Sequence, residues 1–316
     1  MSYNETKEPS MAPVVVFVYN RIDHTTKILE KLNSLSEAKE TDIFIFCDQA
    51  KKENVQDSVN EVREYVSRFK TEISRFKNTK LVLAEHNKGL AKSIIEGVSE
   101  VINKYGKVIV VEDDILVSND FLKYMNAGLE YYASDKNIWS ISGYTFPMRA
   151  LTNYPHDVYA SGRGCCWGWG SWANRWNTVD WEVKDYELFL ASKKKRKEFS
   201  EWGYDLPLLL DACMNGNAQS WAIRWCFSAF CQGSITIYPC KSRVVNIGTD
   251  GSGTNYNKAN NRFDTVLYEG NAECNFEHID VDYRIKKEFA KKYFPFSMKV
   301  KTWIFKIYRL FRHRCG

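Results

Sequence analysis

The sequence predicts an α/β fold in which helices cover both faces of a mostly parallel sheet. Short apolar runs alternate with segments whose apolar residues recur every three or four positions, as in strands followed by amphipathic helices. Each apolar run also ends in polar residues, and the carboxyl ends of parallel strands meet at one edge of a sheet, where ligands bind. The four apolar runs span residues 13–19, 43–47, 80–83 and 107–111.

Taken in order, the first run ends at Asn20 and Arg21, and the second ends at Asp48. The third run leads to a turn that contains Asn87 and Gly89. Helical spacing follows the first three runs, over residues 28–32, 55–69 and 94–102. Because these strand ends share an edge, we expect their polar side chains to surround one ligand. No glycine-rich dinucleotide or phosphate loop follows any of the runs, which excludes ordinary dinucleotide and P-loop enzymes.

The fourth run ends in three consecutive acids, Glu112, Asp113 and Asp114. Like charges side by side at the end of a buried strand raise the energy of the site unless a cation neutralises them. Carboxylate oxygens are hard ligands, so we predict a Mn²⁺ or Mg²⁺ ion that bridges the diphosphate of a nucleotide-activated donor. The alternative is an ordinary strand-end turn, with Asp120 as the cap of the next helix.

Composition limits the class of protein. The 316 residues allow one large α/β domain or one domain with an appendage, and the net charge of +5 is too small to indicate nucleic acid as a partner. The nine cysteines follow no disulfide or zinc framework, which favours free thiols in a reducing cytoplasm. Neither a signal peptide nor an apolar run of spanning length is expected, so we predict a cytoplasmic protein.

The second half is richer in Gly, Trp and Cys. In the stretch 161–172, glycines allow close approach of the backbone to a ligand, and indoles offer flat faces to sugar rings. We therefore predict that Trp167 and Trp169 contact an acceptor, whereas Trp172 and Trp176, four apart on an expected helix, are core residues.

Three further segments have simpler interpretations. The basic run 193–197 is predicted to be a solvated face, with an acidic acceptor as the alternative. The glycine-rich loop 246–255 is either a connector or a flap that closes over the donor. Residues 298–314 form an amphipathic basic and aromatic pattern, which predicts contact with the inner surface of the cell membrane or packing on the domain.

The strand, the acidic triplet and the segment that continues through Asp120 to Ser142 resemble GT-A glycosyltransferases. The resemblance is greatest to the N-acetylglucosaminyltransferase I group, which carries a Glu-Asp-Asp triplet, and extends to bacterial family-2-type sugar transferases. It covers residues 12–255, divided into a nucleotide-binding half (12–145) and an acceptor half (146–255), and leaves 256–316 as a C-terminal helical extension.

The resemblance implies a metal-dependent, inverting transfer from a nucleotide sugar, with a UDP-sugar expected, to a glycan or lipid-linked acceptor in polysaccharide biosynthesis. Asp114 would be the direct metal ligand. The ribose, base and diphosphate would be held by residues at the strand ends: Asn20, Arg21, Asp48, Asn87, Gly89, Leu90, Glu112 and Asp113.

The catalytic base is less directly indicated. An inverting displacement needs a carboxylate to accept the proton of the acceptor hydroxyl. Gln219 stands where the resemblance implies an acidic residue, and an amide cannot act as that base. We therefore name Asp205 and Asp211 as the candidates. Two other functions stay open, a sugar-1-phosphate nucleotidyltransferase and a carbohydrate-binding surface protein without catalysis.

Overall fold

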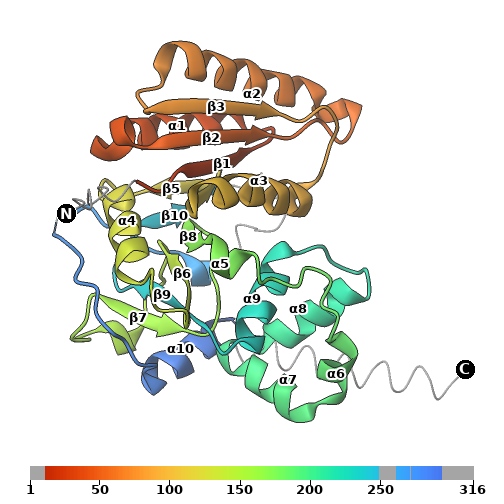
Figure 1. The fold of residues 1–316 in the computed structure, drawn as a ribbon, viewed down its shortest axis with the longest axis vertical. Coiled ribbons are helices and arrows are strands. Elements are labelled where there is room, and N and C mark those ends of the chain that lie inside the picture. Colours follow the sequence, from red (N-terminus) through yellow and green to blue (C-terminus); the bar gives the residue numbers. More distant parts are fainter. Residues whose placement is uncertain (1–10, 249–260, 271, 294–316) are drawn as a thin grey trace, which may run out of the picture.

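The computed structural model of the chain describes residues 11–248, 261–270 and 272–293. Its centre is a sheet built from eight strands: β1 (Val14–Val18), β2 (Asp42–Cys47), β3 (Asn78–Leu83), β4 (Lys107–Glu112), β6 (Ile138–Ser142), β7 (Val158–Ser161), β8 (Trp169–Trp172) and β9 (Ile235–Pro239). Their order is β3-β2-β1-β4-β8-β6-β9-β7 (Figure 1). Strands β1 to β4 are mutually parallel, β6 is parallel to β9, and β7 and β8 are antiparallel to their neighbours. The predicted mostly parallel sheet is confirmed.

Helices cover both faces of the sheet. One face packs against α1 (Ile22–Ser34), α2 (Gln56–Arg68) and α4 (Phe121–Tyr131), and the other packs against α3 (Leu90–Tyr105), α5 (Ala173–Trp176) and α9 (Trp221–Cys231). Side chains of β1 alternate between the two cores, with Val16 in one and Val15 in the other. This two-sided burial explains why the strand is apolar at every position.

The strand order determines where the sheet has a crevice that could hold a ligand. From β1 the chain proceeds outward to β2 and β3, and then returns to the other side of β1 as β4. The reversal leaves a crevice at the carboxyl ends of β1 and β4, the position where open α/β sheets bind ligands. Phe17 of β1 is in register with Glu112 of β4, so the acidic triplet begins at this crevice.

Strand β8 was not expected from the sequence. Trp172 was predicted to share a helix with Trp176, but Trp172 ends the strand and α5 begins only after it. The strand runs beside β4, where a Cβ atom at Gly170 would lie 3.0 Å from the Val108 carbonyl oxygen. The alternation of tryptophan with glycine and serine therefore reflects close packing against β4 and not helical spacing.

A helical layer follows β8 in the sequence and has its own apolar core. It contains α6 (Tyr186–Ala191), α7 (Lys193–Phe199), the short helix η5 (Ser200–Trp202) and α8 (Asp205–Met214), which pack with α9. The other short helices are η1 (Ser36–Glu40), η2 (Glu53–Val55), η3 (Phe69–Ile73), η4 (Arg149–Leu151) and η7 (Asn261–Phe263).

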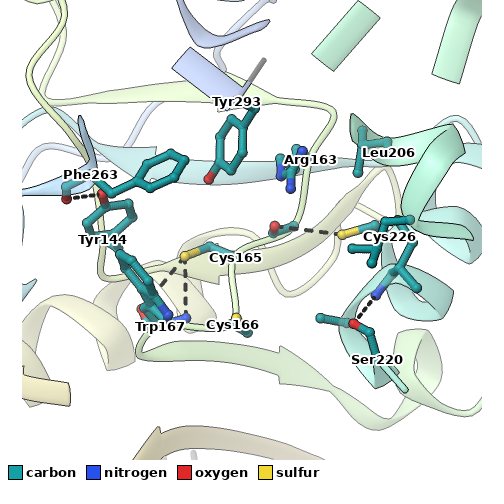
Figure 2. A pocket seen from close by; sticks show the side chains of 14 residues that line it. Tyr144, Arg163, Cys165, Cys166, Trp167, Leu206, Ser220, Cys226, Phe263 and Tyr293 are labelled. Atoms are coloured by element: carbon teal, nitrogen blue, oxygen red, sulfur yellow. Dashed lines mark hydrogen bonds between the residues drawn. The ribbon is translucent and has the colours of Figure 1, made fainter. Parts of the chain in front are cut away.

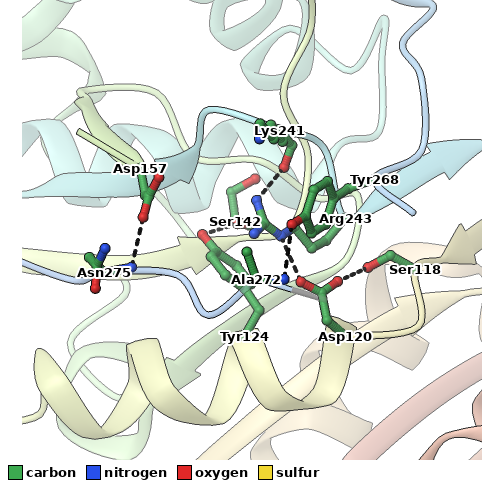
Figure 3. Close-up of polar contacts among 10 residues, drawn as sticks. All are labelled: Ser118, Asp120, Tyr124, Ser142, Asp157, Lys241, Arg243, Tyr268, Ala272 and Asn275. Carbon is green, nitrogen blue, oxygen red and sulfur yellow. Dashed lines mark hydrogen bonds and ion pairs between the residues drawn. The ribbon is translucent and has the colours of Figure 1, made fainter. Parts of the chain in front are cut away.

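A two-stranded sheet lies next to the triplet. β5 (Ile115–Val117) directly follows the triplet and pairs in antiparallel fashion with β10 (Val244–Asn246). The residue before β10, Arg243, is buried and makes an ion pair of 3.3 Å with Asp120 (Figure 3). The Arg243 guanidinium also stacks on the rings of Tyr124 and Tyr268, at 4.8 and 4.5 Å. These contacts fix the position of β10 relative to the triplet.

The central sheet runs through both predicted halves, 12–145 and 146–255, so the two halves share one scaffold. α10 (Tyr283–Tyr293) lies within the predicted extension 256–316 and packs on η5. The amphipathic segment 298–314 and most of the loop 246–255 lie outside the described residues. Among the described residues, no helix is long and apolar enough to span a membrane.

Candidate functional site

The crevice between β1 and β4 brings Arg21 to the acidic triplet. The Arg21 guanidinium makes an ion pair with Asp113 and a second one, of 3.2 Å, with Asp114. Asp113 is 4% exposed, whereas the side chain of Asp114 is 21% exposed. Asp114 is therefore the more accessible of the two aspartates, which is the arrangement that a direct metal ligand requires.

Negative charge exceeds positive charge at the triplet. Burial raises the pKa of Asp113, although the Arg21 charge opposes that shift. Burial, together with the charges of Asp114 and Asp113, raises the pKa of Glu112 to about 8. Burial alone would lower the pKa of Arg21, but the two aspartates raise it above its ordinary value. One guanidinium thus faces three carboxyl groups, and a further cation would relieve their repulsion.

The donor atoms suit a metal that is shared with a ligand. Among the described residues, no group of three or more His, Cys, Asp or Glu side chains converges into a closed metal site. Mg²⁺ and Mn²⁺ do not need such a cage, since they are commonly bound by one or two carboxylates plus substrate phosphates and water. The open carboxylate of Asp114 fits that mode of binding.

The segment after β10 closes one side of the triplet. The Ile247 backbone N–H donates a hydrogen bond of 2.8 Å to the Asp114 carbonyl oxygen. A Cβ atom at Gly248 would lie 2.8 Å from Asp114 Oδ2 and 3.1 Å from Arg21 Nη1. Gly248 therefore allows the backbone to approach Asp114, the predicted metal ligand, closely. From the sequence alone, this glycine was identified only as part of the loop 246–255.

Asp48 organises the neighbouring strand ends. Its Oδ1 accepts from the backbone N–H groups of Gln49 and Lys88, both at 2.9 Å, and its Oδ2 accepts from the N–H of Gly89 at 2.9 Å. The Asn87 amide adds a bond of 3.2 Å to Oδ2. Asp48 thereby joins the end of β2 to the turn that begins α3. Gly89 has a φ of +76°, which favours glycine at this turn.

Asn20 follows β1 and is half-buried at the start of this edge. The structure therefore places all the strand-end residues predicted from the sequence at one edge of the parallel half of the sheet. Their contacts with a nucleotide stay a prediction.

A pocket of about 150 Å³ is lined mainly by residues of the predicted acceptor half, 146–255 (Figure 2). Trp167 lines it, and its ring packs edge-on against Tyr144 at 4.6 Å. The residues that line it are mostly apolar or aromatic, with Arg163 as the charged exception: Tyr144, Arg163, Gly164, Cys165, Cys166, Trp167, Leu206, Leu209, Ser220, Ala222, Ile223, Cys226, Phe263 and Tyr293.

The pocket and the triplet are close enough to interact electrostatically. Burial raises the pKa of Cys166 well above its ordinary value, and the charges of Glu112 and Asp114 add to this shift.

Trp169 does not reach the pocket. It is 1% exposed and packs at 4.6 Å on Trp225 and at 5.6 Å on Trp176. No face of the indole is free for a sugar ring. The prediction that Trp169 contacts an acceptor does not fit its burial, because alternation along β8 directs the side chain into the core between α3 and α9.

Both candidate bases are engaged in ion pairs. Asp205 receives two hydrogen bonds from Arg163, of 2.9 and 2.8 Å, and its side chain is 26% exposed. Asp211 receives two from Arg196, of 2.8 and 2.6 Å, and one of 3.1 Å from Tyr186. Arg163 lines the pocket, whereas Asp211 pairs with residues of α6 and α7 that do not line it. Asp205 is therefore the candidate nearer to the expected acceptor.

Gln219 is exposed and directly precedes Ser220, which caps α9 and lines the pocket. The position that the resemblance assigns to an acidic residue is thus at the rim of the pocket. Sequence reasoning did not identify Arg163 and Tyr293 as pocket residues, since they are brought together only by the packing of α10 on η4 and η5.

Comparisons with known proteins were made on the whole chain. The model of the GNT-I family matches residues 1–198, which is more than half of the sequence. A search of curated proteins found no match. One solved structure to which the chain is similar is the mannosyltransferase PcManGT from Pyrobaculum calidifontis, in complex with GDP-Man and Mn2+. The two chains share 10% identity over 71% of this chain and 69% of the other, with a TM-score of 0.37.

Proposed function

Because this chain belongs to the GNT-I family of glycosyltransferases, we propose that it transfers a sugar from a nucleotide sugar to a hydroxyl of a glycan or lipid-linked acceptor. A UDP-sugar is the expected donor, and inversion at the anomeric carbon is the expected outcome. The observation that carries the proposal is the position of the acidic triplet. It lies at the switch point between β1 and β4, with three carboxyl groups, one guanidinium and an accessible Asp114.

We propose that Asp114 holds a Mn²⁺ or Mg²⁺ ion together with the donor diphosphate. When bound there, the ion would supply positive charge to balance that of the leaving diphosphate. Asp113 is buried against Arg21, so it orients the guanidinium rather than reaching into the crevice. Arg21 is then in position to share the diphosphate charge, and Glu112 is left to accept hydrogen bonds from hydroxyls of the donor.

The nucleoside would be bound by the edge that Asp48 organises. Both carboxylate oxygens of Asp48 accept backbone N–H groups, so its main task is to hold the turn of Asn87 and Gly89 in place. We propose that this turn and Asn20 supply the polar contacts to the ribose and base. Preorganisation of this kind lowers the entropy cost of donor binding.

The acceptor would enter the pocket beside the triplet, with Trp167 as the aromatic surface for a sugar ring. Direct displacement needs a base for the acceptor hydroxyl. We propose Asp205 for this role over Asp211, because its partner Arg163 lines the pocket. Both Asp205 oxygens accept hydrogen bonds from Arg163, so this contact has to loosen before the carboxylate can take the proton of the acceptor hydroxyl.

A second candidate function is supported by the same ion pairs. Gln219 at the rim of the pocket and the pairing of both candidate carboxylates also suit a carbohydrate-binding protein without catalysis. We place either activity at the inner surface of the cell membrane, in assembly of a surface polysaccharide, with 298–314 as a membrane contact.

The test is transfer and hydrolysis with a panel of nucleotide sugars, in the presence of Mn²⁺, Mg²⁺ or a chelator. We expect turnover of one donor that requires the metal. Asp114→Asn should abolish both metal-dependent nucleotide binding and turnover, while the matched Asp120→Asn change at the Arg243 ion pair should keep the metal dependence. Unchanged nucleotide binding and turnover in Asp114→Asn would disprove the metal assignment. Sugar binding without nucleotide or metal, and without turnover, would favour the second function.

A further inference from the structure

The end of the molecule formed by α7 and α10 is strongly basic. α7 carries five basic residues and one acidic residue in seven positions, and α10 carries five and one in eleven. The two helices are far apart in the sequence but lie at the same end of the structure, opposite β3 and α2 (Figure 1). This concentration of charge contrasts with the net charge of +5 for the whole chain.

The two helices are joined through η5. The Lys286 ammonium of α10 makes an ion pair with Glu201 of η5, and it lies 5.4 Å above the Trp202 ring. The same ring packs edge-on against Phe289 of α10, at 6.0 Å. η5 directly continues α7 and also contacts α10, so this short helix connects α7 to α10.

Several cations on this surface lack a carboxylate partner. Arg196 and Lys286 are used internally, by Asp211 and Glu201. The side chain of Lys194 is 87% exposed, and its Nζ lies as far as 4.0 Å from Glu198 Oε1, so this ion pair is weak. Five other lysines are exposed and have no ion-pair partner in the described part of the chain: Lys193, Lys195, Lys197, Lys287 and Lys291.

Exposed apolar side chains flank these lysines. Leu188 is 69% exposed and Leu190 is 43% exposed at the end of α6, immediately before α7. Tyr283, the first residue of α10, is 73% exposed. The inner side of α6 already fills its core with Tyr186 and Phe189, so the two leucines contribute nothing to the packing of this layer. We call this set of five lysines, two leucines and Tyr283 the basic surface.

We propose that the basic surface docks on an anionic lipid bilayer. Each lysine near such a bilayer is attracted by the negative surface potential, and its alkyl stem can remain in apolar surroundings while its ammonium reaches the headgroups. The leucines and the tyrosine that flank the lysines can enter the interface. An acidic protein would also match the charge and could cover the leucines, and it is the occupant left if the full chain does not bind anionic vesicles.

The location of the basic surface also bears on the acceptor. Leu206 and Leu209 of α8 and Tyr293 of α10 line the pocket, so docking brings the pocket close to the bilayer. A lipid-linked sugar is the class of acceptor that this geometry fits. This last step rests on the proposed function, whereas docking itself depends only on the basic surface.

The test is co-sedimentation of the full chain with phosphatidylcholine vesicles, with and without phosphatidylglycerol. We expect binding only to the anionic vesicles. A Lys193→Gln, Lys195→Gln, Lys197→Gln variant should bind on the order of 100-fold more weakly, as expected for three lysines near an anionic surface. A Lys287→Gln, Lys291→Gln variant and a Leu188→Ser, Leu190→Ser variant should each bind more weakly as well. Each lysine multiplies the binding constant for the vesicles by its own factor. The loss in a variant is therefore measurable even if other segments of the chain also bind the vesicles.

The matched control is Lys39→Gln, Lys70→Gln, Lys77→Gln, which removes the same charge from exposed positions at the opposite end of the chain. It should bind like the unaltered protein. The proposal is overturned if the full chain ignores anionic vesicles, or if any surface variant binds no more weakly than this control. Vesicle binding is measured without donor or metal. Docking can therefore hold where sugar transfer fails, and metal-dependent donor hydrolysis should persist in all lysine variants.

Discussion

The guanidinium of Arg163 and the carboxylate of Asp205 form two parallel hydrogen bonds, of 2.9 and 2.8 Å, beside the predicted acceptor pocket. The guanidinium also lies 3.5 Å from the centre of the Tyr293 ring. Burial alone would lower the pKa of Arg163, but the Asp205 charge raises it above its ordinary value. Of the two sequence candidates, the carboxylate near the pocket therefore has both of its oxygens occupied by Arg163.

Asp205→Asn tests whether this carboxylate acts as the base. We expect kcat to fall by about 10²-fold or more with little change in the KM for the donor, as for loss of a general base. Thermal unfolding should be recorded in parallel, since the change leaves Arg163 partly unpaired. The matched control is Asp211→Asn, which breaks an equivalent Arg–Asp pair away from the pocket and should keep kcat. Equal losses in both variants would mean that the effect is structural.

Asp48→Asn should weaken binding of the donor more than it slows turnover. The substitution replaces one acceptor oxygen with an N–H₂ group that faces a backbone N–H donor, and hydrogen bonds to charged groups contribute about 1.5–3 kcal/mol. We expect the nucleotide Kd to rise by about tenfold or more, measured by calorimetry. Asp42→Asn, at the opposite end of the same strand, is the control, because its partners are Asn78 and Tyr105. The same change of Kd in both would contradict the role of Asp48.

Arg243→Gln should destabilise the fold. The Arg243 and Asp120 side chains are 5% and 13% exposed, so the variant leaves a largely buried carboxylate without its cation. Loss of one partner of a buried pair costs about 3 kcal/mol or more, which should appear in denaturant unfolding. Arg284→Gln removes a guanidinium that is 70% exposed and should cost about 1 kcal/mol or less. A similar cost for the two would exclude a special role for Arg243 in holding β10.

The pocket thiols should resist alkylation at neutral pH. Burial raises the pKa of Cys165 to about 11, and burial also raises the pKa of Cys226. A raised pKa keeps the thiol protonated, and the thiolate is the reactive species. Alkylation of Cys165 should therefore be slow at pH 7 and accelerate by about tenfold per pH unit below its pKa. Peptide mapping after iodoacetamide treatment checks this, with exposed Cys231 as the reference. Cys165 labelled before Cys231 at pH 7 would contradict the pocket geometry.

Much of the fold and part of the site could be predicted from local sequence. Strands β1, β2 and β4 are apolar at nearly every position, and the helices between the strands repeat their apolar residues at helical spacing, so the alternation and the parallel sheet followed directly. The triplet at the end of β4 could be located because consecutive acids after a buried strand repel one another unless a cation binds there. The contrasting case is β8, whose Trp-Gly-Ser-Trp sequence has no strand signal without the neighbour β4.

The sequence by itself determined which residues end the parallel strands, since β-strand and helix periodicity are local properties of the chain. Tertiary structure alone decided which charges meet. Arg21 lies between Asp113 and Asp114, Asp48 binds the turn before α3, and Arg163 pairs with Asp205 across 42 residues. It also decided that Trp169 is core and Trp167 is not, because the direction of a side chain from a strand depends on what packs on each face. Pairing and burial are long-range properties, and no local pattern specifies them.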